Sequence, residues 1–288
     1  MNRSKTIHLH DLYKNQRLPS NEALLLLSCL TEKSKEYLLT HGDRAVSLKT
    51  ARAYKRLASR RLSSWPIAYL TGHKEFYGLN FWVSTAVLVP RPETEMIVDL
   101  VLNQFADGLR LIDIGTGSGA IPIAIAASLR RRFPATYRRA SISAIDISPA
   151  ALKVARRNAK KHRLDKKIKF YQGNLIAPLS KSLGENKLPL VITANLPYLT
   201  PKQIKDSPSI QREPRLALDG GKDGLRLYRQ LFCQIKKIEI VAGTTVICEI
   251  DPSQARSIAL EAKRHFPASR VEIIPDLARQ KRLAVIRL

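Results

Sequence analysis

Hydrophobic residues follow a helical period over the first quarter of this 288-residue chain. Residues 43–61 place apolar side chains three and four positions apart on one stripe, with Lys and Arg elsewhere. The run NEALLLLSCL (21–30) predicts another helix, which the Ser20 hydroxyl would cap. We therefore expect a helical domain over residues 1–73.

The pattern changes at Lys74. The stretch EFYGLNFWVSTAVLVP (75–90) is rich in aromatic and β-branched residues and contains a glycine, which predicts a β-hairpin. Pro90 and Pro92 end it, and a helical period resumes at Glu93. We expect residues 74–92 to form a β-hairpin linker and residues 93–288 to form a second domain.

Beyond Glu93, short apolar runs alternate with helical segments. Strands are expected at 110–114, 141–146, 168–172, 188–194 and 244–250, with 270–274 and 282–288 as a terminal pair. Helices are expected at 120–132, 149–162, about 223–237 and 252–265. This alternation indicates an α/β fold, a mostly parallel sheet with helices on both faces.

Composition adds limits on the class of protein. The chain is 44% hydrophobic and 25% charged, as is usual for a globular protein. No apolar run approaches the roughly 18 residues of a membrane span, and the N-terminus lacks the apolar stretch of a signal peptide. The three cysteines form no CxxC pair, which favours a reduced, cytoplasmic compartment and argues against zinc. We expect no metal and no membrane.

The net charge is unusual. The 49 Lys and Arg residues against 24 Asp and Glu give +25. Such an excess favours a polyanionic partner such as RNA or the ribosome, and a basic, well-solvated surface is the alternative. The sequence leaves both open. The basic residues cluster at 130–132, 138–139 and 153–167 without interleaved aromatics, which gives little support for base stacking.

A glycine-rich turn, DIGTGSG (113–119), follows the first strand of the second domain. Glycines at alternate positions let the backbone approach a ligand and lead into a helix N-terminus. Asp146 ends the next strand, where a nucleoside-binding fold places an acid on the ribose hydroxyls. The alternative is that Asp146 caps the helix beginning near Pro149. Together with the turn, Asp146 favours a nucleoside ligand, and the turn is not a P-loop.

The run LPLVITA (188–194) ends in Asn195-Leu196-Pro197-Tyr198. As the fourth strand it would lie beside the first, so Asn195 would emerge next to the glycine turn, where ligands bind in open α/β sheets. The Asn195 side-chain oxygen and a backbone carbonyl freed at Pro197 make two acceptors, which suit a planar NH₂ group under the Tyr198 ring. This geometry favours methyl transfer from S-adenosylmethionine to a poorly nucleophilic nitrogen.

The motifs DIGTGSG, AIDIS and NLPY, in this order, resemble those of class I S-adenosylmethionine-dependent N-methyltransferases. Residues 60–95, 211–229 and 248–255 further resemble the HemK-type protein-glutamine N5-methyltransferases. This resemblance implies a Rossmann-like, seven-stranded methyltransferase domain joined by the hairpin to a helical substrate-recognition domain. It also implies methylation of the Gly-Gly-Gln glutamine in peptide chain release factors, or, in a sister group, of a ribosomal-protein glutamine.

The resemblance also assigns roles to residues. The cofactor's methionine part would lie along Gly115, Thr116, Gly117, Ser118 and Gly119. Its ribose would bind Asp146, and its adenine would lie near Leu175, where Asn174-Leu175 replaces the family's acidic and aromatic pair. The substrate amide would be held by Asn195 and the Leu196 carbonyl, with Pro197 fixing the bend and Tyr198 packing on the amide.

Leu196 stands where the HemK-type family has its first proline. The ribosomal RNA adenine-N6 dimethyltransferases have the sequence Asn-Leu-Pro-Tyr at this motif. RNA methylation is therefore the alternative activity. A residue before proline is nonetheless biased to extended backbone, and its carbonyl is present whatever its side chain. The RNA enzymes would also lack the PRPETE and GGKDGL stretches. Glutamine is therefore the favoured substrate.

Glu249 stands at the end of a predicted strand. It is expected to shape the pocket, cap a helix or form an ion pair.

Overall fold

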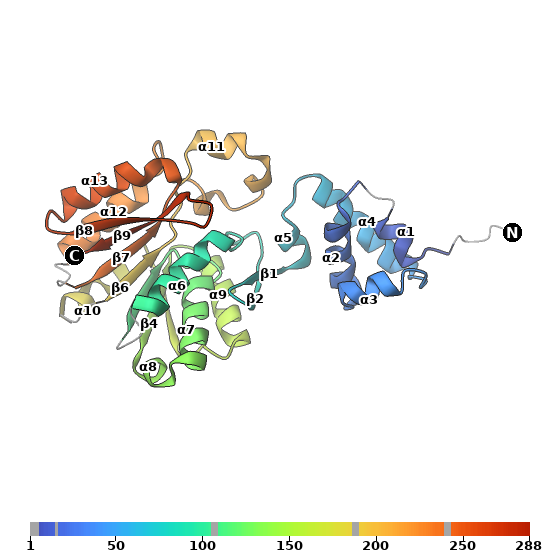
Figure 1. The fold of residues 1–288 in the computed structure, drawn as a ribbon, viewed down its shortest axis with the longest axis horizontal. Coiled ribbons are helices and arrows are strands. Elements are labelled where there is room, and N and C mark those ends of the chain that lie inside the picture. Colours follow the sequence, from blue (N-terminus) through green and yellow to red (C-terminus); the bar gives the residue numbers. More distant parts are fainter. Residues whose placement is uncertain (1–5, 15–16, 105–108, 186–189, 239–242) are drawn as a thin grey trace. The chain divides into compact units, whose positions relative to one another are not determined.

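The computed structural model describes residues 6–14, 17–104, 109–185, 190–238 and 243–288. It divides into two compact units, residues 1–73 with 208–212 and residues 74–207 with 213–288 (Figure 1). No helix in these described ranges is long and apolar enough to cross a membrane. The same ranges hold no group of His, Cys, Asp and Glu arranged to bind a metal ion.

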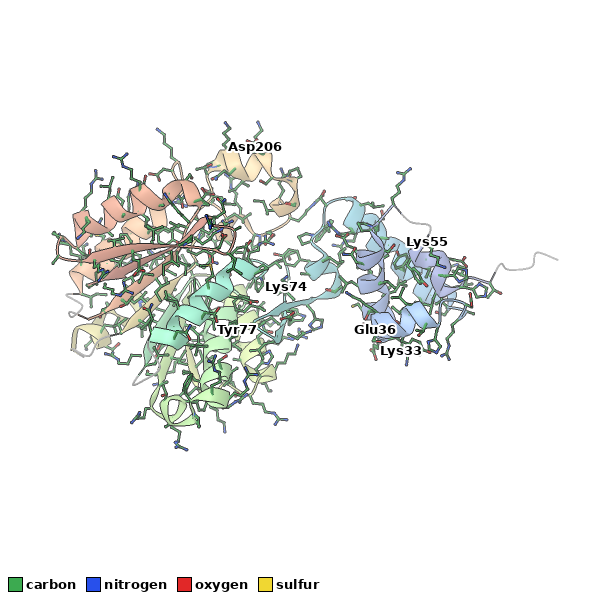
Figure 2. All side chains as sticks on the ribbon, viewed as in Figure 1. Lys33, Glu36, Lys55, Lys74, Tyr77 and Asp206 are labelled. Atoms are coloured by element: carbon green, nitrogen blue, oxygen red, sulfur yellow. The ribbon has the colours of Figure 1, made fainter. Side chains whose placement is uncertain are left out.

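The N-terminal unit is helical. Its helices are α1 (Leu9–Tyr13), α2 (Ser20–Thr31), α3 (Lys35–Thr40), α4 (Leu48–Leu62) and α5 (Ile67–Thr71). Their apolar stripes meet in a core that includes Leu26, Leu27, Leu38 and Tyr54, all fully buried. Exposed charged side chains include Glu36 on α3, Lys55 on α4 and Lys33 in the loop between α2 and α3 (Figure 2).

Two expected helix starts in this unit are wrong. Ser20 is the first residue of α2 and does not cap it, because the N-cap position is occupied by Pro19. Helix α4 begins at Leu48 rather than Asp43, since the Ser47 hydroxyl accepts a hydrogen bond from the Thr50 N–H. In both cases the residue with cap geometry, not the first polar residue, decides where the helix begins.

A two-stranded hairpin, β1 (His73–Phe76) and β2 (Leu79–Trp82), follows. Its turn uses Tyr77 and Gly78, both at positive φ. The Tyr77 N–H donates to the Glu95 carboxylate at 2.8 Å, and Tyr77 is labelled in Figure 2. The hairpin is therefore tied to the start of helix α6 (Glu95–Gln104) within the same unit.

The larger unit contains a seven-stranded sheet in the order β5-β4-β3-β6-β7-β9-β8. Its strands are β3 (Arg110–Ile114), β4 (Ser141–Asp146), β5 (Ile168–Gln172), β6 (Val191–Ala194), β7 (Thr245–Glu249), β8 (Arg270–Pro275) and β9 (Lys281–Arg287). Only β9 runs antiparallel to its neighbours. The expected class of fold is confirmed, and β6 pairs with β3 as predicted, with Ala194 opposite Ile114.

Helices cover both faces of the sheet (Figure 1). Their bounds are α7 (Ala120–Arg132), α8 (Pro134–Arg139), α9 (Pro149–Lys161), α10 (Ser180–Glu185), α11 (Pro201–Asp206), α12 (Arg226–Lys237) and α13 (Ala255–His265). Leu111 and Ile142 pack with α6 and α7 on one face. Ile112 and Val246 pack with α12 and α13 on the other, as alternating strand positions require.

Candidate active site

A cavity of about 580 Å³ opens at the carboxyl ends of the central parallel strands. Its walls come from the loop after β3, the end of β4, the loop after β5, the end of β6 and segments 86–91 and 214–219. All these residues belong to the larger unit. The place agrees with the general rule for ligand binding in open α/β sheets.

The glycine turn forms one wall of this cavity. Gly115, Thr116, Gly117 and Ser118 line it, whereas Gly119 lies behind them at the start of α7. Gly115 has φ of 71°, and a Cβ there would lie 3.0 Å from the Leu196 Cδ2 atom. Only glycine therefore lets the turn pass this close to the end of β6.

Asp146 faces the same turn from the end of β4. Its carboxylate accepts hydrogen bonds from the Gly117 N–H at 2.8 Å and the Ser148 N–H at 2.9 Å. Burial raises its pKa, although these backbone bonds act in the opposite direction. The N-cap of α9 is Ser148, whose hydroxyl accepts the Ala151 N–H. Asp146 thus does not cap that helix, and its oxygens keep lone pairs beside the cavity.

We expect Asp146→Ala to weaken cofactor binding by about 1.5–3 kcal/mol, because a ribose diol would lose a charged acceptor. Titration calorimetry with S-adenosylmethionine measures this loss. An unchanged affinity would reassign Asp146 to ordering the glycine turn alone.

Leu175 also lines the cavity and is 6% exposed. It adopts the left-handed conformation with φ of 55°, which directs the chain after β5 back toward the sheet. Asn174 lies beside it in the same wall. The structure thus places Leu175 among the other expected cofactor residues.

Asn195 is held by a buried carboxylate. Its Nδ2 donates to Glu249 Oε2 and to Thr94 Oγ1, each at 3.0 Å. Thr94 Oγ1 donates to the same Glu249 oxygen at 2.7 Å, and Glu249 is 2% exposed at the end of β7. The Asn195 Nδ2 atom therefore faces this carboxylate and hydroxyl. The Asn195 Oδ1 atom makes no hydrogen bond to the described residues, so it remains for a ligand.

Tyr198 belongs to the same network. Its hydroxyl donates to Glu249 Oε1 at 3.2 Å, and burial followed by the nearby Glu249 charge raises the pKa of Tyr198. Burial also raises the pKa of Glu249, although hydrogen bonds from Thr94 and Tyr198 lower it. Tyr198 is not among the residues that line the cavity, whereas Asn195, Leu196 and Pro197 are.

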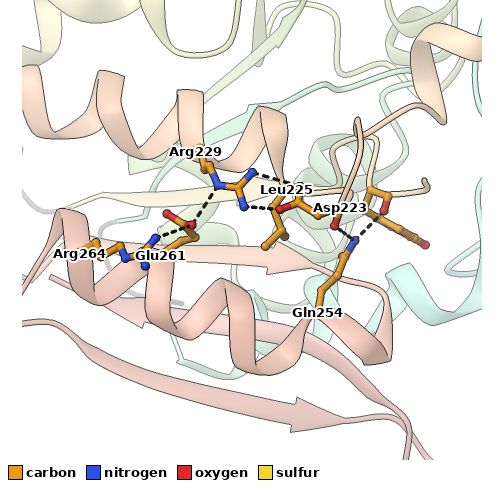
Figure 3. A network of polar contacts seen from close by, with 7 residues as sticks. Asp223, Leu225, Arg229, Gln254, Glu261 and Arg264 are labelled. Carbon is orange, nitrogen blue, oxygen red and sulfur yellow. Dashed lines mark hydrogen bonds and ion pairs between the residues drawn. The ribbon is translucent and has the colours of Figure 1, made fainter. Parts of the chain in front are cut away.

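The backbone of the tetrapeptide is fixed from behind. The Gln254 side-chain nitrogen donates to the Tyr198 carbonyl at 2.7 Å and to the Asp223 carbonyl at 3.2 Å (Figure 3). Gly224 has φ of 74°, and any side chain there would collide with the Tyr198 carbonyl and the Gln254 amide. The GGKDGL stretch therefore packs directly against the end of the tetrapeptide.

Figure 3 also shows how this packing is anchored to helices α12 and α13. Asp223 pairs with Arg229, which donates to Glu261 at 3.0 Å, and Arg264 reaches the same Glu261 oxygen at 3.2 Å. Thr94 and Gln254 were missed by the sequence analysis. Thr94 lies in the stretch PRPETE (90–95) and Gln254 in CEIDPSQA (248–255), both of which carry the family resemblance. Nothing in these stretches indicated that the two side chains contact Asn195 or Tyr198.

Asp113 lies fully buried beneath the glycine turn. Its Oδ1 accepts from the Thr193 hydroxyl at 2.7 Å. In the described structure its Oδ2 and the neighbouring Thr116 hydroxyl have no hydrogen-bond partner. Burial, the dominant cause, raises the pKa of Asp113 to about 7.

This raised pKa predicts a pH-dependent stability. The folded protein binds the Asp113 proton up to about pH 7, whereas the unfolded chain releases it near 3.8. Stability is therefore lost as pH rises through 7, by about 1.4 kcal/mol between pH 6 and 8. We expect Asp113→Asn to remove this loss in urea unfolding at the two pH values. The exposed control Asp165→Asn should keep it, and an equal pH dependence of Asp113→Asn and wild type would contradict the prediction.

Known proteins share both parts of the chain. Residues 12–72 match the PrmC N-terminal domain family, and residues 105–268 match a Methyltransferase domain family. The release factor glutamine methyltransferase of Moorella thermoacetica is 35% identical over 92% of this chain and 89% of its own length. That of Neisseria gonorrhoeae is 35% identical over 91% of each chain. The chain belongs to the release factor glutamine methyltransferase family.

Membership of this family confirms the expected methyltransferase activity and S-adenosylmethionine as the cofactor. Among solved structures, the hMettl16 catalytic domain in complex with MAT2A 3'UTR hairpin 6 is 14% identical, with a TM-score of 0.56 over 85% of this chain and 84% of that one. The complex with hairpin 1 has a TM-score of 0.55 over 98% and 95%, at 14% identity. These likenesses support the class I methyltransferase fold and nothing finer.

The cavity fits the cofactor in its size and in its polar groups. A volume of about 580 Å³ lies within the usual range of small-molecule sites. The turn at Gly115–Ser118 permits close approach of a ligand, and Asp146 offers a carboxylate beside it. The assignment of individual residues to parts of the cofactor remains a prediction.

Proposed function

We propose that this chain transfers a methyl group from S-adenosylmethionine to the side-chain nitrogen N5 of the Gly-Gly-Gln glutamine in a peptide chain release factor. The observation that carries the proposal is the fixed orientation of Asn195. Because Glu249 and Thr94 hold the Nδ2 atom on their side of the amide, Asn195 presents Oδ1 as an acceptor at the cavity wall. An amide NH₂ is a donor that matches this acceptor.

The Leu196 carbonyl supplies the second acceptor in this proposal, since no described residue donates a hydrogen bond to it. Two acceptors would hold both hydrogens of the glutamine NH₂ and aim its lone pair at the methyl group. An amide nitrogen is a weak nucleophile, so alignment is the main contribution, and proximity can supply about 7–11 kcal/mol. The same two hydrogen bonds would strengthen as positive charge develops on the nitrogen.

The names of the relatives support a release factor as the substrate. The test supplies tritiated S-adenosylmethionine with a release factor, a ribosomal protein fraction or ribosomal RNA in parallel reactions. Peptide mass spectrometry should then find one added methyl group on the Gly-Gly-Gln peptide. Label in RNA with none on glutamine would overturn the proposal, and label only in the ribosomal proteins would support the sister activity.

The variant Leu196→Pro distinguishes methylation of a glutamine from methylation of an RNA adenine. Residue 196 would contribute only its carbonyl and an extended backbone, both of which proline keeps, so activity on a release factor should stay within about tenfold. The Leu196 N–H would be lost, but it makes only a long 3.4 Å bond to the Tyr228 hydroxyl. That hydroxyl keeps its bond to the Glu249 carbonyl.

The measurement compares wild type and Leu196→Pro with both substrates, a release factor at saturation and ribosomal RNA. A drop of several hundredfold at unchanged cofactor affinity would mean that the Leu196 side chain itself shapes the substrate pocket.

The positive charge of the chain also supports RNA or the ribosome as a second partner, alongside the release factor.

A further inference from the structure

Nearly half of the net charge of +25 lies in one segment of the larger unit. Residues 130–172 contain 14 Lys and Arg and only two acids, a net charge of +12. The remainder of the larger unit holds 21 Lys and Arg against 17 Asp and Glu, so it is nearly balanced. The N-terminal unit, with 14 Lys and Arg against five acids, carries a further +9, so within the larger unit the excess charge lies mainly between residues 130 and 172.

These 14 cations form what we call the basic face. Its members are Arg130, Arg131, Arg132, Arg138, Arg139, Lys153, Arg156, Arg157, Lys160, Lys161, Arg163, Lys166, Lys167 and Lys169. All except Lys167 are exposed. They come from the end of α7, from α8 and α9, and from the segment leading into β5, the edge strand of the sheet.

These elements lie side by side (Figure 1). Arg130 donates to the His162 and Arg163 carbonyls at 3.3 and 3.2 Å, which joins the end of α7 to the end of α9. Lys167 donates to the Arg138 carbonyl at 3.3 Å, which joins α8 to the segment before β5. The cations are therefore one continuous surface.

Several of these cations are positioned by aromatic rings instead of by carboxylates. Arg132 lies over Phe133, Arg156 over Phe170, Arg157 over Trp82 and Lys167 over Tyr137, with cation-to-ring distances of 5.5, 5.5, 4.0 and 4.8 Å. Within the described residues, none of these four cations forms an ion pair with an acid. Their charge is ordered and remains available to an external anion.

The same contacts restrict the class of partner. Each of these four rings is partly buried and has a cation over one face, so they offer little surface on which single-stranded bases would stack. Ile147 is the one large exposed hydrophobic residue within the described part of this segment, and it lines the cofactor cavity. A protein interface would need an apolar centre, and a membrane-binding surface would need apolar side chains to insert.

We propose that the basic face binds the phosphate backbone of a double-helical nucleic acid. Such a backbone offers closely spaced anions to these exposed cations, four of which are ordered by aromatic rings, and it requires neither stacking nor an apolar contact. The surface is separate from the residues expected to hold the cofactor and the glutamine. It would hold the enzyme on a structured nucleic acid while the cavity remains free.

The test measures fluorescence anisotropy of labelled 20-base-pair RNA and DNA duplexes between 50 and 300 mM salt. The basic-face variant replaces Arg131, Lys153, Lys160 and Lys166 by Gln, four exposed residues whose side chains make no hydrogen bond or ion pair to the described residues. We expect it to bind the RNA duplex at least about tenfold more weakly than wild type does. Its slope of log affinity against log salt should fall by about 3, close to one for each phosphate contact removed.

A matched control replaces Lys236, Lys237, Arg256 and Arg270, exposed residues on α12, α13 and the opposite edge strand β8, by Gln. It carries the same net charge as the basic-face variant and should bind within about threefold of wild type. Equal losses in the two variants would overturn the proposal, because total charge would then explain binding. Comparison of the RNA and DNA arms identifies the kind of duplex.

Two further probes, a 20-nucleotide single strand and phosphatidylserine vesicles, complete the experiment. Binding to the single strand as tight as to either duplex, or binding to vesicles without duplex binding, would also overturn the proposal. Methyl transfer by the basic-face variant to a free release factor should remain at the wild-type rate. If duplex binding fails, the proposed methylation activity is therefore unaffected. If methyl transfer fails, the proposed duplex binding is likewise unaffected.

Discussion

Asn195→Ala should reduce turnover on a release factor by about 100- to 1,000-fold while leaving cofactor affinity close to that of wild type. The variant removes the acceptor proposed for the glutamine NH₂, and the loss of one preorganised polar group at a reacting centre has this magnitude. Asp146 and the glycine turn, which would hold the cofactor, make no hydrogen bond to the Asn195 side chain within the described residues and should keep their arrangement.

Single-turnover kinetics with saturating release factor measures the effect, and titration calorimetry follows cofactor binding. Asn103→Ala is the matched control, because Asn103 is an exposed residue on α6 outside the cavity lining. Turnover of Asn195→Ala within tenfold of wild type would show that the amide is held by other groups. A large loss of cofactor affinity would instead place Asn195 mainly in the cofactor site.

The sequence predicted the features that depend on local pattern and on sheet topology. Strand and helix alternation gave the parallel sheet, and the apolar run before Asn195 gave the adjacency of β6 and β3. The glycine turn was placed correctly because a requirement for close approach leaves a visible spacing in the sequence. The structural reason for the glycine at position 115 is its close approach to the Leu196 side chain.

The remainder of the site depends on contacts between distant segments. Thr94 and Glu249 are 155 positions apart, and both reach Asn195 through side chains whose directions follow from the packing of α6 and β7. Gln254 supports the Tyr198 carbonyl across 56 positions. No local pattern carries such information, since a buried Thr, Glu or Gln has the same sequence signature whether it caps a helix or orients an active-site amide.

The sequence also left open whether the +25 charge serves a polyanionic partner or only a well-solvated surface. Burial and topology were needed to see that the cations between residues 130 and 172 share one exposed surface. The sequence analysis found no aromatics interleaved with the basic clusters, although Phe133 and Tyr137 stand between two of them. In the folded protein, Phe133 lies under Arg132, and Trp82, which is distant in sequence, lies under Arg157.

Glu249→Met should reduce turnover by about 100-fold or more, and Glu249→Gln should stay within about tenfold of wild type at pH 8. Methionine has a similar volume but offers no acceptor to Asn195 Nδ2, so the amide is free to turn and present its NH₂ to the cavity. Glutamine can keep its oxygen toward Asn195 and Thr94 and place its NH₂ against the Tyr198 hydroxyl, which can accept. The comparison separates the orienting role of Glu249 from its charge.

The pH profile provides a second test of the same residue. Burial raises the pKa of Glu249. Thr94, Asn195 and Tyr198 all donate hydrogen bonds to its carboxylate, so the ionised form supports the network. Wild-type turnover should therefore fall as pH decreases through that raised pKa, and Glu249→Gln should lack this acidic limb. Thr94→Val, measured against Thr94→Ser, removes the bridging hydroxyl and should lower turnover in the same direction. If Glu249→Met keeps wild-type turnover, or if cofactor affinity and melting temperature fall in proportion to its rate, Glu249 is a structural residue and does not orient Asn195.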